Sequence, residues 1–518
     1  MKINQLVYSV LLAVSVWNTG CTDNFADINR PKDAATGDIM EGDNFRTGAF
    51  YIKLQSTVIP DGTGGYQHGE SLTGDVWGRY MMSNVKWKGQ NFSEFSYQHV
   101  GWINNPFNQL AQFYPAWREI LQSTKETGVN FAWAKVLRVA AMQRLTDMYG
   151  PLPYSQINGN SLYVPYDSQE QLYKTMLKDL TEASEVLAQY AEQNPGEAPM
   201  KDFDRVYDGD YRKWALFANS LKLRMAMRMR FAEPELAKQM AEEAVSNGVI
   251  VSNDENAAYQ PAAKSAFYTI AQLWGDCRVC ADIAAYMKGY NDPRQSKYFD
   301  VSGFSGVDFA GLRSATNVTD QVYTKYSKPV VGEFDKYIWM TASEVAFLKA
   351  EGAMLGWNMG ETGDAAAKKF YEEGINLSFA QWGAGSASSY INDNTSTQAD
   401  YVDPNNGAEN VQAVSTITIK WNSADSEERK LERIITQKWL AMWPLGQEAW
   451  SEYRRTGYPK LFPLVRKPVD SKYNTLLVGN RLQFATTEYT ENATNILDAV
   501  RLLGGADDLA TPMWWQKK

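Results

Sequence analysis

The sequence contains little of what most catalytic and metal-binding sites are built from. Only two of its 518 residues are histidines, His68 and His99, and only three are cysteines. Because histidine is the usual base in catalytic triads and the commonest metal ligand, these counts argue against sites of either kind. The chain also lacks the H-E-x-x-H, G-x-S-x-G, P-loop and dinucleotide-binding motifs. We therefore expect no metal, no cofactor and no enzymatic activity.

An excess of positive charge is also absent. The chain carries 51 Lys and Arg against 60 Asp and Glu, which gives a net charge of -9 and a pI near 5.1. Binding to nucleic-acid phosphates requires concentrated Lys and Arg, so a nucleic-acid partner is not expected. After the first 20 residues, no apolar run is long enough to span a membrane.

The two internal cysteines, Cys277 and Cys280, form an isolated C-x-x-C motif. A zinc site needs two further ligands at a suitable spacing, and the chain offers no second pair. A thioredoxin-type site needs a βαβ context, whereas the flanking sequence has a helical pattern. Two interpretations remain, a local disulfide bond or two unreactive thiols in an oxidising compartment.

Four aspartates lie close together, at Asp202, Asp204, Asp208 and Asp210. Clustered carboxylates suit calcium, but the spacing does not fit an EF-hand loop because Val206 occupies a ligand position. The pattern favours a helix cap at Asp210 with solvated charges before it.

The first 20 residues have the pattern of a signal peptide. Lys2 precedes an apolar run from Leu6 to Trp17, and small or polar residues follow. The sequence up to Cys21 resembles a lipobox, in which the cysteine becomes lipid-modified after cleavage. We expect residues 1–20 to be removed, Cys21 to be lipidated and residues 21–40 to form a tether. Ordinary secretion with an incidental Cys21 is the alternative.

The rest of the chain is predicted to be mainly α-helical, because apolar residues recur at helical spacing through most of it. The expected helices cover 106–125, 131–149, 172–190, 211–231, 234–248, 341–355 and 363–382, with a helical hairpin at 425–459 that Pro444 divides. Start and stop signals accompany them: Ser168, Asp210 and Asp425 or Ser426 as N-caps, and Gly457 as a C-cap.

Three regions interrupt this pattern, near 55–104, 249–336 and 384–423. They are rich in Gly, Ser, Asn and Tyr or are long and polar. Loops of this length in a compact protein are usually functional or disordered. We expect residues 41–518 to form a single domain with these three loop-rich insertions.

Five segments, in order along the chain, resemble the SusD/RagB family of nutrient-binding outer-membrane lipoproteins. They are QRLTDMYGPLPYSQ at 143–156, YDGDYRKWALFANSLKLRMAMR at 207–228, NDPR at 291–294, SEVAFLKAEGAMLGW at 343–357, and IITQKW at 434–439 with EAWSEYRRTGYPKL at 448–461. Together they span nearly the whole mature chain.

The resemblance implies a fold in which four helical pairs, similar to tetratricopeptide repeats, support an irregular ligand-binding region. It also implies a protein exposed at the cell surface that is anchored in the outer membrane by its lipid. Such a protein captures an oligomeric nutrient and delivers it to a SusC-like TonB-dependent transporter. The acidic sequence after Cys21 is similar to the surface-export signals of Bacteroidetes lipoproteins.

Aromatic side chains in the irregular regions are the candidate ligand contacts. Sugar rings have apolar C–H faces on which Trp and Tyr stack, and loops held by a rigid scaffold present such platforms well. The candidates are Trp77, Tyr80, Trp87, Trp102, Tyr268, Trp274 and Tyr323. Packing in the core is the competing interpretation for each of them, since large aromatic residues are often buried.

Oligosaccharide is the expected ligand, and oligopeptide is the alternative within the same family. An alternative of a different class is a secreted glycoside hydrolase on a helical scaffold. That enzyme requires two carboxylates that flank a cleft, and the 60 acidic residues leave many combinations open.

Overall fold

The computed structural model describes residues 45–87, 90–91, 100–157, 163–319, 321–468 and 470–518. Its contacts divide the chain into residues 1–49 and residues 50–518. Of the first unit, only the beginning of helix α4 (Phe45–Val58) is described. The expected signal peptide, Cys21 and the tether therefore lie outside the described residues. All further description concerns the second unit.

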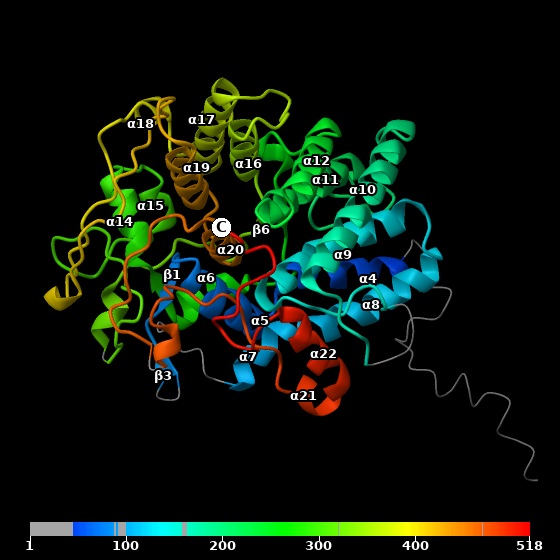
Figure 1. Cartoon of the computed structure of the whole chain (residues 1–518), viewed down its shortest axis with the longest axis horizontal. Coiled ribbons are helices and arrows are strands. Elements are labelled where there is room, and N and C mark those ends of the chain that lie inside the picture. The colour runs from blue at the N-terminus through cyan, green and yellow to red at the C-terminus, as the bar shows by residue number, and fades with distance from the viewer. Residues whose placement is uncertain (1–44, 88–89, 92–99, 158–162, 320, 469) are drawn as a thin grey trace, which may run out of the picture. The chain divides into compact units, whose positions relative to one another are not determined.

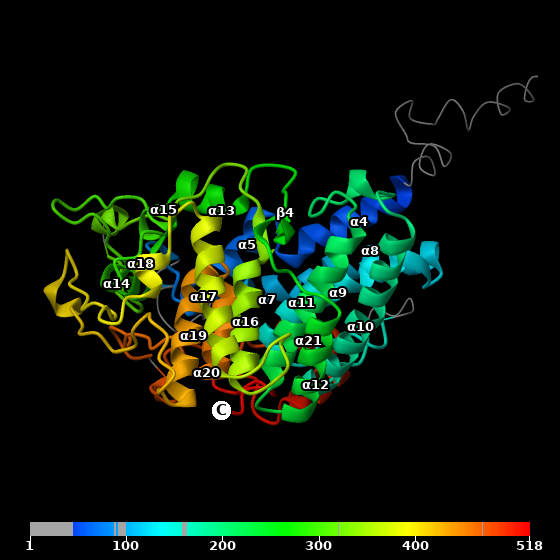
Figure 2. The same ribbon diagram turned by 90° about the horizontal axis from the view of Figure 1, so that it is seen from above.

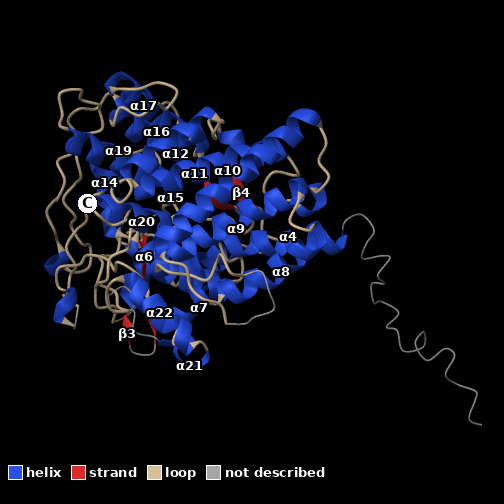
Figure 3. Ribbon diagram, turned by 45° about the vertical axis from the view of Figure 1, so that its right-hand side comes forward, coloured by secondary structure: helices blue, strands red, loops and turns tan. Residues whose placement is uncertain are grey.

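Helices dominate this unit, and the few strands are short (Figure 3). This confirms the predicted fold class. One group of helices comprises α8 (Gln109–Thr124), α9 (Gly128–Tyr149), α10 (Gln169–Gln193), α11 (Tyr211–Met229) and α12 (Pro234–Ser246). Each of them packs against the next in the chain (Figure 1). Side-chain caps begin two of these helices as predicted: Ser168 accepts a hydrogen bond from the Gln171 amide, and Asp210 accepts one from the Lys213 amide.

A second group comprises α16 (Ala342–Met354), α17 (Asp364–Gln381), α19 (Glu427–Ala441) and α20 (Gly446–Thr456). Helices α16 and α17 lie side by side, and α19 packs on both (Figure 2). Ser426 caps α19, and Gly457 ends α20 in the left-handed conformation, as predicted. Gly374 of α17 makes a close approach possible, because a Cβ there would stand 2.8 Å from the Phe347 ring.

The remaining elements are shorter. The other α-helices are α5 (Thr63–Tyr66), α6 (Asp75–Trp77), α7 (Val100–Phe107), α13 (Ala266–Tyr268), α14 (Ala281–Gly289), α15 (Gln295–Tyr298), α18 (Ser388–Ile391), α21 (Glu488–Glu491) and α22 (Ala493–Leu503). The described π-helical segments are η2 (Gln67–Gly74) and η5 (Thr269–Trp274), and the described 3-10 turns are η3 (Lys201–Phe203), η4 (Asn253–Glu255), η6 (Gln321–Lys325), η7 (Gly407–Glu409) and η8 (Ser471–Tyr473). Among the described residues, antiparallel pairing joins β1 (Met81–Ser83) to β5 (Cys277–Val279), β2 (Lys86–Trp87) to β3 (Gln90–Asn91), and β4 (Ala257–Tyr259) to β6 (Tyr337–Met340).

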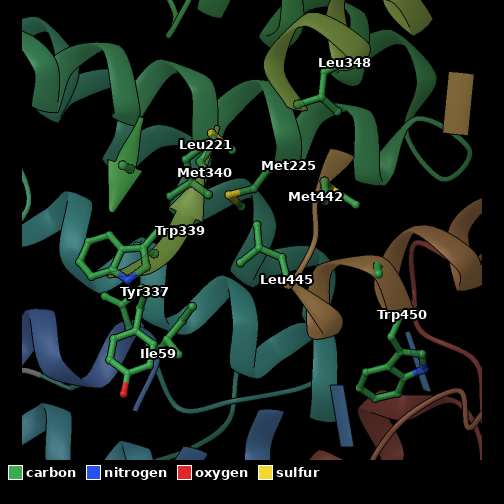
Figure 4. Close-up of a cluster of buried hydrophobic side chains, with 14 of the residues drawn as sticks. Ile59, Leu221, Met225, Tyr337, Trp339, Met340, Leu348, Met442, Leu445 and Trp450 are labelled. Atoms are coloured by element: carbon green, nitrogen blue, oxygen red, sulfur yellow. The ribbon is translucent and has the colours of Figure 1, made fainter. Parts of the chain in front are cut away.

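The core is built around the hairpin of α19 and α20. Figure 4 shows Met442, Leu445 and Trp450 of this hairpin in one apolar cluster with Met225 of α11 and Leu348 of α16. All five side chains are buried. The hairpin is thus the structural centre of the domain.

Charged residues of the family-like segments meet inside this core. Arg228 of α11 forms ion pairs with Asp147 of α9 and with Glu448 and Glu452 of α20, and all four side chains are at most 3% exposed. Arg294 of the NDPR segment is likewise buried and bonds the Asp292 carboxylate. Because a buried charge is tolerated only when it is paired, these segments are restrained together.

The prediction of a loop-rich region at 55–104 is wrong for much of its length. Residues 63–77 form a continuous helical stretch through α5, η2 and α6. Gly74 near the end of this stretch and Gly78 directly after it permit close packing on the chain at 446–447. A Cβ on Gly78 would stand 2.4 Å from the Gly446 carbonyl oxygen, and one on Gly74 would stand 2.7 Å from the Gln447 nitrogen. Glycine in a helix permits such backbone contact, so the glycine-rich composition did not indicate a loop.

No helix among the described residues combines the length and the apolar character that crossing a bilayer requires.

Candidate functional site

Trp274 is an exposed aromatic side chain that the fold presents outward. Ser265 caps α13, which continues into η5, and Gly275 ends η5 with a positive φ of 70°. Ile270 and Ala271 of η5 are buried, so the segment is anchored. The Trp274 side chain is 53% exposed. A tryptophan on an anchored turn loses little conformational freedom when it stacks on a ligand.

Trp102 forms a second aromatic surface on α7. Its ring lies 4.7 Å from the His68 ring at an interplanar angle of 37°, and it is partly exposed. The Asn105 amide nitrogen lies 2.5 Å from Nδ1 of His68. Asn104 exchanges two hydrogen bonds of 3.0 Å with Thr486, one from its amide nitrogen to the hydroxyl and one to its amide oxygen from the backbone N–H. These contacts hold the Trp102 ring in place, with the amide groups of Asn104 and Asn105 on the same helix.

The two aromatic surfaces belong to one region, because α7 and α13 both pack on η2. Figure 2 shows α7, α5 and α13 in the same part of the fold. The Gln67 amide of η2 donates a 3.0 Å hydrogen bond to Oδ2 of Asp276, two residues after Trp274. Burial raises the pKa of Asp276, while the hydrogen bond from Gln67 and the charge of Arg278 lower it. We define the candidate site as Trp102 and Trp274 with the polar side chains that connect their elements, namely Gln67, His68, Asn105 and Asp276; Gln67, His68 and Asp276 are buried, and Asn105 is partly exposed.

Three predicted contact residues lie in the core instead. Trp77 is 4% exposed and packs on Trp450, with ring centroids 4.6 Å apart. Tyr80 is fully buried and its hydroxyl donates a hydrogen bond to the Trp439 carbonyl. Tyr323 is 6% exposed, and its ring stacks with that of Tyr326. The prediction that these three rings face a ligand does not agree with this burial, which leaves their faces covered by the protein.

The other two predicted contacts differ from these. Tyr268 of α13 is partly exposed, and its backbone amide donates to the Ser265 hydroxyl. Trp87 belongs to β2, but its side chain lies outside the described part of the structure. Of the seven predicted aromatic residues, Trp102, Tyr268 and Trp274 therefore combine a described side chain with access to solvent.

The polar members of the candidate site were not predicted from the sequence. Gln67 and His68 lie in the region near 55–104 that was predicted to be loop-rich. His68 could have been noticed as a candidate, because histidine is rare in this chain. Asn105 and Asp276 carry no comparable signal, because amide and carboxylate residues are frequent throughout.

The structure settles the two open interpretations of the cysteines. Cys277 and Cys280 are both buried and are not bonded to each other. Burial raises the pKa of Cys277 to about 12 and that of Cys280 well above its ordinary value. Thiols at such pKa values stay protonated and unreactive near neutral pH.

The run of aspartates has a structural role. Asp204 is buried and accepts hydrogen bonds from the amides of Val206, Tyr207 and Gly209 and from the indole of Trp214. Asp210 caps α11. Within the described ranges, no group of three or more His, Cys, Asp or Glu side chains is arranged to hold a metal ion.

The chain is similar in sequence and in structure to proteins of one known family. The protein-family model described as SusD-like, the SusD and RagB outer membrane lipoproteins, matches residues 27–516. A crystal structure of a SusD homologue from Bacteroides thetaiotaomicron is 38% identical, with a TM-score of 0.84 over 91% of this chain and 99% of that chain. A SusD homologue from Bacteroides uniformis is also 38% identical, with a TM-score of 0.82 over 92% of this chain and 100% of that chain.

A third similar structure is a chitin-binding SusD homologue from Flavobacterium johnsoniae. It is 34% identical, with a TM-score of 0.85 over 91% of this chain and 98% of that chain. A comparison with curated proteins found no match. The family match spans the segments whose charged residues meet in the core. The chain therefore belongs to the SusD/RagB family of outer-membrane lipoproteins.

Proposed function

We propose that this protein binds an oligosaccharide at the cell surface and delivers it to a SusC-like TonB-dependent transporter. The observation that carries the proposal is the exposed Trp274 on an anchored turn, in one region with the partly exposed Trp102 and Asn105 of α7. An aromatic face binds the apolar side of a sugar ring, and amide and carboxylate groups bond its hydroxyls. Membership of an outer-membrane lipoprotein family that includes a chitin-binding homologue supports a glycan as ligand.

Attachment through Cys21 belongs to the same proposal. A lipid on this residue would hold the domain at the membrane through the segment that precedes α4. The ligand site and the membrane anchor would then be separate parts of the chain, so each can be removed by mutation without the other.

The carboxylates near the candidate site favour binding over hydrolysis. A glycoside hydrolase needs two carboxylates that reach the substrate from opposite sides of a cleft. Asp75, whose pKa burial and the charge of Glu70 raise well above its ordinary value, is 0% exposed and out of reach of a substrate. Glu70 is paired with Arg144, and Asp276 accepts the hydrogen bond from Gln67.

A single screen distinguishes the candidate functions. Purified protein in detergent solution is titrated with soluble glycans and with peptides in a calorimeter, and each glycan is then assayed for new reducing ends. We expect binding to at least one glycan and no new reducing ends. Binding to peptides alone would show that the ligand is an oligopeptide and not an oligosaccharide. New reducing ends would show that the protein is a glycoside hydrolase.

The transporter partner is tested separately. We expect affinity purification of the protein from detergent-solubilised outer membranes to retain a TonB-dependent transporter. Its absence from material that still binds glycan would remove the delivery step from the proposal while leaving the binding step intact.

A further inference from the structure

A cavity of about 270 Å³ lies beside the candidate site, at the end of α7. Apolar side chains form its floor, namely Phe107, Leu110, Tyr114, Ile157 and Val164. Each of these is buried, with between 5% and 8% of its surface exposed. The floor is therefore a fixed apolar surface within reach of solvent.

Polar side chains surround this floor. Asn108, Arg118, Glu488 and Asn492 all line the cavity. Glu488 is held in place because its Oε2 accepts hydrogen bonds from the Tyr166 hydroxyl at 2.7 Å and from the Asn492 amide at 3.0 Å. The cavity thus combines an apolar floor with amide, carboxylate and guanidinium groups, which include both donors and acceptors.

The cavity adjoins the candidate site through two connections. Asn104 and Thr486 are joined by the pair of 3.0 Å hydrogen bonds described above, and Glu488 follows Thr486 by two residues. Along the other wall, Phe107 and Asn108 come one helical turn after Asn104 and Asn105. The cavity and the Trp102 surface therefore share the helix α7 and its contact with Thr486.

We propose that this cavity is a further subsite that binds one pyranose unit of an oligosaccharide whose other units lie on Trp102 and Trp274. The inference rests on the proposed function. The apolar floor matches the C–H face of a sugar ring, and the surrounding groups match its hydroxyls, which both donate and accept. Pockets for whole drug-sized ligands measure about 300–1,000 Å³, so this volume suits one ring and not a complete oligomer.

The test fills the cavity and compares ligands of different lengths. Ala111 lines the cavity from the exposed side of α8, so Ala111→Phe places a ring in it without disturbing the core. Gln112→Phe is the matched control, since Gln112 is exposed on the same helix and does not line the cavity. Both variants and the wild type are titrated with dimers through hexamers from chitin, starch, cellulose, xylan and mannan.

We expect Ala111→Phe to weaken binding of the longest oligomer about tenfold, the effect of losing roughly 1.4 kcal/mol at one ring, and to leave the shortest bound oligomer unchanged. Gln112→Phe should match the wild type throughout. Asn108→Ala, which removes one amide at the exposed start of α8, should reduce the same length-dependent gain by a smaller factor.

Two results would overturn the inference while leaving the proposed function intact. Unchanged affinity of Ala111→Phe and Asn108→Ala for every oligomer would show that the cavity takes no sugar. Equal weakening of short and long oligomers by Ala111→Phe would show that the substitution acts on the Trp102 region instead. Failure of the wild type to bind any oligomer is a distinct result, which would overturn the proposed function itself and this inference with it.

Discussion

Arg455 and Glu351 form a bidentate ion pair that joins α20 to α16. Nη1 and Nη2 of the arginine lie 2.6 and 2.7 Å from the two carboxylate oxygens, and neither side chain is exposed. Arg230 also reaches Oε1 of Glu351, at 2.9 Å. Although burial alone would raise it, the charges of Arg455 and Arg230 hold the pKa of Glu351 below its usual value. Arg455 therefore ties α20 to α16 within the second group of helices, and Arg230, which directly follows α11, links this pair to the first group.

Replacing Arg455 should destabilise the protein strongly. Arg455→Met leaves Glu351 and Glu452 buried without their main partner, which typically costs about 3–5 kcal/mol. We expect a corresponding loss in the free energy of unfolding, measured by urea denaturation. Arg501→Met is the matched control, because the Arg501 side chain is 77% exposed and its pair with Asp498 lies at the surface. Equal stabilities for the two variants would contradict the structural role of the buried pair.

Asp75 should make the stability fall as the pH rises. Burial and the nearby Glu70 raise its pKa well above the usual value, while Arg144 and the Gly446 amide oppose this. The contribution of protonated Asp75 to the free energy of unfolding is complete below the unfolded-state pKa of about 3.9. As the pH rises from there to the folded-state pKa, this contribution is lost at up to about 1.4 kcal/mol per pH unit.

Asp75→Asn removes this titration. We therefore expect the stability of the variant, relative to the wild type, to increase between about pH 5 and about pH 8 in urea denaturation. Asp498→Asn, which removes a carboxylate at an exposed site, is the control for the loss of one negative charge. A constant difference between Asp75→Asn and the wild type over this range would mean that the buried carboxyl has no raised pKa.

Trp77 should contribute to the stability of the fold and should not contact the ligand. Its ring is buried against Trp450, and Gly479 would clash with it if it carried a Cβ, at 2.9 Å. We expect Trp77→Ala to lower the free energy of unfolding by about 3–5 kcal/mol, as for other buried aromatic residues. A variant as stable as the wild type in urea denaturation would contradict this packing.

Helix boundaries were the most predictable part of the fold, because local chemistry decides them. Ser168, Asp210 and Ser426 each cap a helix with their own side chain, and Gly457 ends one with a positive φ. These rules involve residues only a few positions apart and can be read from the sequence.

The candidate site was predicted less well, since burial depends on partners far away in the chain. Trp77 and Trp274 both lie in regions rich in glycine and aromatic residues, yet only Trp77 is covered by Trp450. Likewise, Gly78 packs closely on Gly446. Such contacts join residues several hundred positions apart, so no local pattern indicates them.

The lipid anchor should depend on one residue. Cys21→Ser removes the thiol that we expect to be acylated, so the protein should leave the membrane fraction when cells are fractionated. Its glycan affinity in solution should stay unchanged, because the candidate site lies elsewhere in the chain. Continued sedimentation of the variant with the outer membrane would contradict lipidation at Cys21. Cys277→Ser is the control, since this buried thiol has no role in anchoring.

The most direct measurement of the central claim is a calorimetric titration of Trp274 variants with the best glycan from the screen. We expect Trp274→Ala to weaken binding about tenfold, which corresponds to roughly 1.4 kcal/mol, with unfolding stability unchanged. Trp274→Phe should retain part of the affinity, and Val186→Ala, an exposed apolar change on α10, should retain all of it. Wild-type affinity in Trp274→Ala would contradict the claim that this exposed ring holds the sugar.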